Sequence, residues 1–374
     1  MPELIEAVRQ AVAAGGAPPA DVRLALAQSG DPELLGTAGR LLGRLGERPG
    51  ALRPVRLLLV ADCPSGPLAP LLRAVLVAAG AWPGAEPEPS TGRADPCFEA
   101  QLAGAAAELV VVLLDERWFL PHRFDLTDPD PLGAHLAGRL DRLAALAAAA
   151  LDSGTATLVL HTVPLPRRLR DTVLGLHARG VLTRHWSRLN CGLLELAGAD
   201  GRIQAVDLAG LLATAGGPAR SGAAGYSDAA LLLLAQEVRR IAQARLGLSR
   251  RALALGPDAA GWPAELARTV RRLADQGVRL LPADPAGCHR GAEPPLPAEL
   301  FVRHPAGWTS RAGSLRRAAE ALGLGPEAVV FLTGSGFERG HVAAELPEVA
   351  VVDGAADPAR LVEALLGHGW FDQP

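Results

Sequence analysis

Short runs of apolar residues alternate with helical patterns along most of this chain. From residue 55 onward the apolar runs cover residues 55–60, 108–114 and 155–161, and helical stretches cover residues 68–79 and 132–151. Continuous apolar strands that alternate with helices are typical of a parallel sheet covered on both faces. The pattern therefore predicts a doubly wound α/β domain.

The first fifty residues have a different pattern. Apolar positions recur at helical spacing, and Pro2-Glu3 and Asp31-Pro32-Glu33 have the proline and acidic residues typical of helix starts. The segment ends at Glu47-Arg48-Pro49-Gly50, which is a turn signal. We expect a helical segment over residues 1–50.

A second series of strands and helices begins near residue 250. Its apolar strands are residues 252–255, 277–281, 328–332 and 349–352, and its helices are residues 263–276, 314–322 and 358–367. With a break near residues 245–250, we predict an α/β fold of two doubly wound parallel-sheet domains, 51–247 and 248–374, after the helical segment.

Composition narrows the possible partners. Hydrophobic residues make up 49% and charged residues 21% of the 374 residues, as in an ordinary globular protein, and the net charge of −3 favours no nucleic acid. The apolar runs are too short to span a membrane, and the N-terminus has acids where a signal peptide would be basic. The four cysteines form no CxxC pair, so we expect no zinc site and a cytoplasmic location.

Every basic residue apart from histidine is an arginine, because the sequence contains no lysine. Together with abundant Ala, Gly and Pro, this composition is typical of GC-rich coding DNA. It excludes a P-loop lysine, a Schiff-base lysine and any other catalytic lysine.

Several short sequences in the second domain resemble the haloacid-dehalogenase (HAD) half of FkbH-like proteins. They are Val329-Val330-Phe331-Leu332, Phe337-Glu338-Arg339, Glu345-Leu346-Pro347-Glu348-Val349-Ala350-Val351, Trp308 with Leu315-Arg316-Arg317-Ala318-Ala319, and Gly369-Trp370-Phe371-Asp372. The first domain resembles, more loosely, the SGNH-hydrolase-like core of the same family.

The resemblance implies an activity. Active members are expected to transfer a glyceryl unit from a phosphorylated glycerate to a carrier protein, with loss of phosphate, in polyketide and related pathways. HAD chemistry needs an aspartate nucleophile after the first strand, a second aspartate as acid/base, a Ser or Thr, a lysine, and acids that hold magnesium.

This sequence departs from that set at nearly every position. Gly256 occupies the position of the nucleophile, and Asp258 that of the acid/base. Ala283 or Asp284 occupies the position of the Ser or Thr, and Arg311 that of the lysine. Thr333-Gly334-Ser335 occupies the positions of the metal-binding acids. We therefore predict neither an aspartyl phosphate nor a magnesium site, and no cofactor.

Two of these positions allow a plainer interpretation. Asp258 could be a helix cap or turn residue, since aspartate is common at both. The glycine-rich Thr333-Gly334-Ser335 could present backbone N–H groups to an anion or could form an ordinary turn.

In the first domain, Cys63 stands where an SGNH hydrolase has its serine nucleophile. The expected Asp-x-x-His pair before Gly225-Tyr226 is replaced by Gly217-Pro218-Ala219-Arg220. Asp115 and His161 follow predicted strands, where ligands collect in open sheets, and either could serve Cys63. The alternative is a buried, inert cysteine and a histidine satisfied by the backbone.

These observations lead to three hypotheses. The first is a catalytically degenerate FkbH-like protein that binds an acyl carrier protein or a homologous biosynthetic enzyme, with Arg303, Arg311 and Arg339 as candidate contacts. The second is an acyl or glyceryl transferase or hydrolase that uses Cys63, or a remodelled HAD pocket with Asp258, Asp284 and His289. The third is a metal-free sensor of phosphorylated metabolites.

Overall fold

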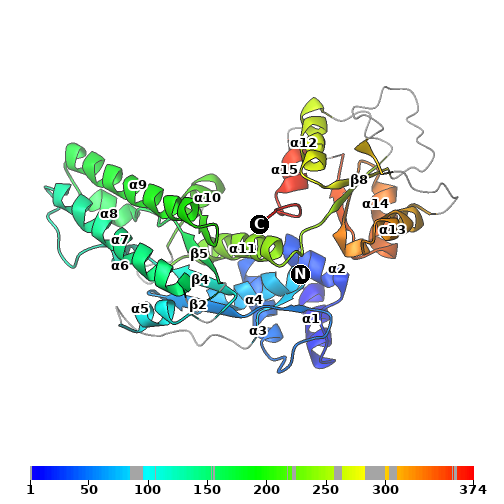
Figure 1. The fold of residues 1–374 in the computed structure, drawn as a ribbon, viewed down its shortest axis with the longest axis horizontal. Coiled ribbons are helices and arrows are strands. Elements are labelled where there is room, and N and C mark those ends of the chain that lie inside the picture. Colours follow the sequence, from blue (N-terminus) through cyan, green and yellow to red (C-terminus); the bar gives the residue numbers. More distant parts are fainter. Residues whose placement is uncertain are drawn as a thin grey trace. The chain divides into compact units, whose positions relative to one another are not determined.

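The chain folds into two compact α/β units in a computed structural model (Figure 1). The first unit contains residues 1–17 and 29–239, and the second contains residues 18–28 and 240–374. The structure describes residues 2–84, 96–105, 107–152, 154, 156–216, 218–220, 225–256, 263–282, 300–302, 310–355, 357 and 360–374.

The N-terminal helices are divided between the two units. α1 (Pro2–Ala13) and α3 (Pro32–Leu42) belong to the first unit, whereas α2 (Ala20–Gln28) belongs to the second. Leu24 of α2 packs against the core of the second unit. The start of α3 follows the predicted signal, because the Asp31 carboxylate accepts hydrogen bonds from the N–H groups of Glu33 and Leu34 at 2.9 and 3.1 Å.

The first unit is built on a parallel sheet. β2 (Leu57–Ala61), β4 (Leu109–Leu113), β5 (Thr157–His161) and β6 (Ile203–Val206) follow one another in that order. All five residues of β4 and of β5 are buried, as expected for strands covered on both faces.

A short parallel pair extends this sheet. β1 (Arg53–Pro54), two residues before β2, pairs with β3 (Ala81–Trp82). Arg53 and Val55 donate N–H groups toward β3, at 2.9 and 2.8 Å, whereas Asp62 donates to Leu113 O on the β4 side at 3.1 Å. Because alternate N–H groups of a strand point to opposite edges, β3 and β4 flank the β1–β2 line on opposite sides. The resulting order across the sheet is β3, then β1 with β2, then β4, β5 and β6. When β1 and β2 are counted as one strand, this is the order 2-1-3-4-5 of doubly wound flavodoxin-like sheets.

Helices cover both faces of this sheet. They are α4 (Leu68–Ala78), α5 (Pro96–Ala103), α6 (Glu116–Phe119), α7 (Asp130–Asp152), α8 (Arg167–Thr172), α9 (Leu176–Ala199), α10 (Leu208–Ala215) and α11 (Asp228–Arg245). α3 packs closely on α4 because residue 39 is glycine: a Cβ there would overlap the carbonyl of Pro70. The division between the two units falls within α11.

The second unit has a parallel sheet of β10 (Ala350–Asp353), β9 (Val329–Thr333), β7 (Ala252–Leu255) and β8 (Arg279–Pro282), in that order. Its helices are α12 (Ala264–Asp275), α13 (Arg311–Ala321), α14 (Gly336–Glu345) and α15 (Leu361–Leu366), with a 3-10 turn at Pro326–Ala328. Leu253 and Leu255 of β7 pack on the side of α12 and α15, while Ala252 and Ala254 pack on the side of α13 and α14.

The predicted α/β class with two doubly wound parallel sheets is confirmed. The units differ from the predicted domains in two respects. The division lies at residues 239/240 rather than 247/248, and α2 leaves the N-terminal helical segment for the second unit. Among the described residues, no helix is long and apolar enough to cross a membrane.

Candidate functional site

Both sheets bring predicted site residues to their carboxyl ends. In an open α/β sheet, ligands bind at the carboxyl ends of two neighbouring strands whose following helices lie on opposite faces of the sheet. The loops after these two strands diverge and leave a crevice between them. In the second unit this point lies between β7 and β9, and in the first it lies between β2 and β4. The residues after these four strands therefore form the two candidate sites.

Gly256 follows β7, where the resemblance predicts the position of the HAD nucleophile. It is buried, and its N–H donates to Leu332 O of β9 at 2.8 Å, which continues the sheet ladder by one residue. With no side chain, Gly256 offers no group that could accept a phosphoryl group. Asp258 and Asp284 lie outside the described residues.

The turn after β9 forms a helix cap. Ser335 caps α14 by accepting the Glu338 N–H at its hydroxyl, 3.3 Å away. The fully buried Thr333 accepts the Ser335 N–H at 3.3 Å and donates its own hydroxyl to Glu338 Oε2 at 3.1 Å. Thr333, Gly334 and Ser335 therefore form a capped turn that holds Glu338 in place.

Arg311 reaches the same glutamate from the other side. It is the first residue of α13, and its Nε and Nη2 donate to Glu338 Oε1 at 3.1 and 2.7 Å. The two side chains are only 18% and 16% exposed. The Arg311 cation, which the resemblance places at the position of the HAD lysine, is thus compensated by a carboxylate of the protein itself.

A second arginine–carboxylate pair lies beside the first. Arg339 of α14 forms an ion pair with Asp353, at the end of β10, at 2.6 Å. Its Nη1 also donates to the carbonyls of Thr333 and Gly334 at 3.2 and 3.0 Å. Arg339 therefore ties the turn after β9 to the end of β10.

This arrangement does not fit magnesium. Mg²⁺ prefers carboxylate and water oxygens in octahedral geometry, but the two described acids at this edge, Glu338 and Asp353, are each occupied by an arginine. Within the described part of the chain, no three His, Cys, Asp or Glu side chains lie together as a metal site would need. No phosphoryl-transfer step follows from these residues.

At the edge of the first sheet, His161 is held entirely by the backbone. Its Nε2 accepts the Leu114 N–H at 3.3 Å, and its Nδ1 lies 2.9 Å from Thr162 O, so Nδ1 carries the proton. Burial lowers the pKa of His161 to about 4, although the Thr162 carbonyl acts in the opposite direction. In this arrangement neither ring nitrogen can take a proton from Cys63.

Cys63 itself lies in surroundings that favour the thiol. Its Sγ is 3.9 Å from Leu113 O, and burial, followed by the negative charge of Asp115, raises the pKa of the thiol. A reactive cysteine needs the opposite environment, with a nearby cation that stabilises the thiolate. The geometry matches the alternative of a buried, inert cysteine.

Asp115 belongs to a buried ion-pair network. Its side chain is fully buried and caps α6 by accepting the Arg117 N–H at 2.8 Å. Arg220 Nη1 donates to Asp115 Oδ2 at 3.2 Å and to Glu116 Oε2 at 2.7 Å, and Arg168 approaches Glu116 Oε1 at 3.2 Å. The resemblance predicts the SGNH acid–histidine pair in the segment that contains Arg220, and a guanidinium cannot act as a general base.

Two further side chains complete this edge. Tyr226 pairs with Arg220 in an isolated antiparallel bridge, and its hydroxyl donates to Leu114 O at 2.8 Å. Burial and the charge of Asp115 raise the pKa of Asp62 to about 6. The edge is therefore lined by polar groups around a neutral histidine.

Several members of these networks are not among the residues predicted for a site, and Glu116, Arg220 and Glu338 are the central ones. Glu338 had a readable signal, because Ser335 and Glu338 have the S-x-x-E spacing of a capping box. The contacts of Arg220 had none, since its partners lie more than a hundred residues earlier.

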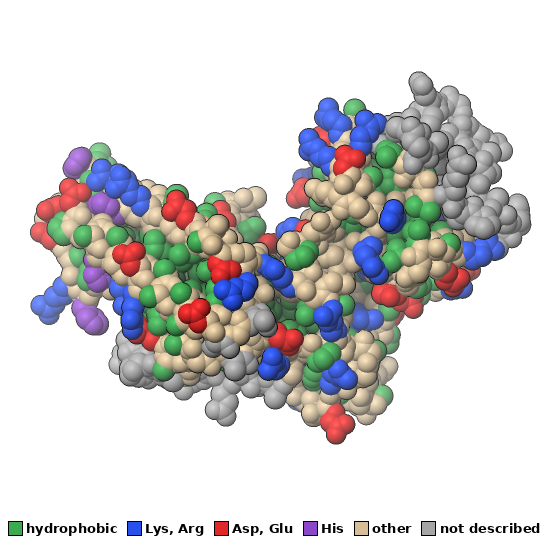
Figure 2. Space-filling model, viewed as in Figure 1, with side chains coloured by type: hydrophobic (Ala, Val, Ile, Leu, Met, Phe, Trp, Pro, Cys, Tyr) green, Lys and Arg blue, Asp and Glu red, His purple; other side chains and the backbone are tan. Residues whose placement is uncertain are grey.

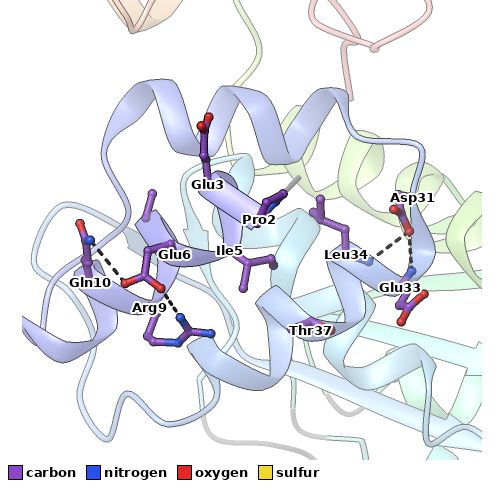
Figure 3. A pocket seen from close by; sticks show the side chains of 11 residues that line it. Pro2, Glu3, Ile5, Glu6, Arg9, Gln10, Asp31, Glu33, Leu34 and Thr37 are labelled. Atoms are coloured by element: carbon purple, nitrogen blue, oxygen red, sulfur yellow. Dashed lines mark hydrogen bonds and ion pairs between the residues drawn. The ribbon is translucent and has the colours of Figure 1, made fainter.

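An open groove of about 780 Å³ lies elsewhere in the first unit, between α1 and α3 (Figure 3). Its lining includes Ile5, Glu6, Asp31 and Leu34 and contains none of the predicted site residues. Its chemistry is therefore separate from that of the two sheet edges.

No protein-family model and no curated protein sequence matches this chain. Its fold is similar to that in the crystal structure of the N-terminal part of the protein BF1531 from Bacteroides fragilis, which contains a phosphatase domain and is complexed with Mg. The TM-score is 0.66 at 19% sequence identity, and the match covers 90% of this chain and 98% of that one. The likeness shows that this chain shares the α/β fold of that structure.

Proposed function

We propose that this chain is a catalytically degenerate FkbH-like protein of polyketide-type secondary metabolism. In this role it binds an acyl carrier protein or a partner enzyme and performs no HAD phosphoryl chemistry. The observation that carries the proposal is the edge of the second sheet. Gly256 stands at the nucleophile position, and Glu338 neutralises the cation that would otherwise face a phosphate.

The charges at this edge disfavour phosphoryl transfer. Phosphoryl transfer depends on positive groups and a metal that stabilise charge on the transferred group, and on a nucleophile in line with it. At this edge both arginines, Arg311 and Arg339, are paired with carboxylates of the chain. A phosphate that entered would have to displace Glu338 or Asp353, and no described side chain replaces the lost nucleophile.

The alternative, acyl or glyceryl transfer through Cys63, has less support. Its thiol has a raised pKa, and the backbone occupies both nitrogens of His161. A covalent mechanism would need another base close to the sulfur.

The first test is an activity assay on the purified full-length chain. We expect no Mg²⁺-dependent release of phosphate from p-nitrophenyl phosphate above the level of an Arg311→Ala variant prepared in parallel. Release that depends on Mg²⁺ and is lost in Arg311→Ala would show that the HAD site still works, and the proposal would fail.

The second test addresses the partner. Native mass spectrometry of the tagged protein, purified from its own host, should show an unmodified chain in complex with a carrier protein or a synthase. An acyl-sized mass increment on Cys63 would instead support the transferase alternative.

A further inference from the structure

Two leucines stand fully out into solvent in the first unit. Leu174 and Leu176, between α8 and α9, are 86% and 81% exposed, whereas Val173 and Ala178 on either side are buried. Large apolar side chains exposed together at one point are characteristic of contact sites. We call residues 174–176 the leucine tip.

The tip is held in this position by its flanks. Arg179 Nε and Nη2 both donate to Val173 O, at 3.1 and 3.0 Å, and the Thr172 hydroxyl donates to Arg168 O at 2.5 Å. Because the backbone just before the tip is fixed by these bonds, the exposure of the leucines is a property of the fold.

The surroundings of the tip are basic. Residues 167–179 contain four arginines and one aspartate. Figure 2 shows basic, acidic, histidine and hydrophobic side chains next to one another at the end of the first unit where Figure 1 draws α8 and the start of α9. A partner surface should therefore be acidic and should offer an apolar floor.

The groove between α1 and α3 has these two properties. Ile5 and Leu34 supply apolar lining, and Figure 3 shows them between charged groups on both sides. The charged residues in the lining are Glu3, Glu6, Asp31, Glu33 and Arg9, four acids and one base. Arg9 is paired with Glu6, so the groove keeps a negative excess.

We propose that the leucine tip of one molecule docks into the α1–α3 groove of a second copy of this chain. The two surfaces have opposite charge, and each combines an apolar centre with a charged rim. Figure 1 places α8 and α1 at opposite ends of the first unit, so a molecule cannot fill its own groove. The contact joins different patches of the two copies and can therefore extend from copy to copy.

The contact is weak and depends on salt. Two leucines and a few arginines cover far less than the roughly 800 Å² per partner of a stable interface. Rim charges mainly steer association and are screened at ~1 M salt, where the Debye length falls to about 3 Å. Association should therefore appear at high protein concentration and low ionic strength.

The test is sedimentation velocity of the full chain over a wide range of concentration, at low salt and at ~1 M NaCl. We expect the average mass to rise with concentration at low salt and to fall to the monomer at high salt. A tip variant (Leu174→Ser with Leu176→Ser) and a groove variant (Ile5→Glu) should each stay monomeric. Phe337→Ser, which removes an 83%-exposed side chain of the second unit, should associate like the wild type.

A mixing experiment identifies the geometry. The tip variant keeps an intact groove and the groove variant keeps an intact tip, so an equimolar mixture should form a 1:1 dimer and nothing larger. Circular dichroism must show that both variants are folded.

Three results would overturn the proposal: a wild-type chain that is monomeric under all conditions, a tip variant that still associates, or a mixture that stays monomeric. If the monomeric wild type instead binds vesicles rich in phosphatidylserine and the tip variant does not, the tip is a membrane-contact site.

Discussion

The carboxyl ends of the two sheets occupy the same topological position in their units but satisfy their polar groups in different ways. At the first edge, Asp115 and Glu116 are almost completely buried, and His161 is bonded only to the backbone. At the second edge, the Arg311–Glu338 and Arg339–Asp353 pairs retain partial access to water.

The difference concerns how much each edge contributes to the stability of its unit. A buried charge that loses its partner is costly, so the network around Asp115 should support the stability of the first unit. Pairs closer to the surface contribute less, so the second edge should tolerate changes that the first does not. Four predictions test this contrast, from the largest expected effect to the smallest.

Replacing Arg220 with methionine should cause the largest decrease in the free energy of unfolding. Asp115 and Glu116 would keep only their contacts to Arg117 and Arg168, which are 52% and 64% exposed. Breaking a buried pair costs about 3–5 kcal/mol, and urea unfolding would measure it. The matched control, Arg117→Ala, should cost less than about 1 kcal/mol. Similar losses of unfolding free energy in both variants would contradict the view that burial determines how much an ion pair contributes to stability.

The second prediction concerns the stability of the folded protein at low pH. The pKa of His161 is about 4 in the folded protein, whereas that of an unperturbed histidine is 6.5. Its neutral form therefore stabilises the fold above pH 6.5, and this contribution is lost as the pH falls through about 4. The loss amounts to at most about 3 kcal/mol. In His161→Gln, which can keep one donor and one acceptor, this part of the pH dependence should disappear from urea unfolding curves.

Asp62 provides the comparison, because its pKa changes in the opposite direction. Its folded pKa of about 6 lies above the ordinary 3.8, so its contribution is present below pH 3.8 and is lost as the pH rises through 6. Asp62→Asn should therefore be more stable than the wild type at neutral pH. If both variants had the same pH profile as the wild type, the two groups would not be coupled to folding.

The third prediction is a moderate effect at the second edge. Arg311→Ala leaves a mostly buried Glu338 without its guanidinium and should cost about 1–3 kcal/mol. Arg311→Lys should recover part of this loss because it keeps the charge. The control is Arg142→Ala in the more exposed pair with Glu99, which should cost about 0.5 kcal/mol. A loss at Arg311 as small as that at Arg142 would mean that the pair adds nothing to the fold.

The smallest effect concerns the rates of thiol alkylation and leaves stability unchanged. In a chain with Cys97→Ser and Cys288→Ser, iodoacetamide should modify the exposed Cys191 and leave Cys63 unmodified until denaturant is added. The reason is that the thiolate is the reacting form and the pKa of Cys63 is raised. Peptide mass spectrometry gives both rates, and faster labelling of Cys63 would reopen the transferase hypothesis.

The strands that can be predicted from the sequence are those buried on both faces. β4 and β5 consist of continuous apolar residues, and the predicted runs match them to within a residue or two. β6 is not predicted, because Ile203-Gln204-Ala205-Val206 lies at the sheet edge and is only partly buried. A four-residue strand with a polar residue gives little periodic signal.

For the candidate site, the sequence located the strand ends but could not identify what each side chain contacts. Cys63, Asp115 and His161 do lie at one edge, as carboxyl ends of parallel strands must. The chemistry of Asp115 is decided by Arg220, and that of His161 by the Leu114 N–H and the adjacent Thr162 carbonyl. Arg220 and Leu114 lie far in the sequence from the side chains that they bond. Such long-range contacts leave no local pattern.

The position of α2 has a consequence for synthesis. The helix is synthesised before the rest of the second unit, and Leu24 packs against strands and helices that lie more than two hundred residues later in the chain. Bringing such distant segments together closes a long loop, which slows folding. Until the C-terminal part is complete, α2 has an apolar face that a chaperone could bind. The second unit would also lose part of its core if it were expressed from residue 240 alone.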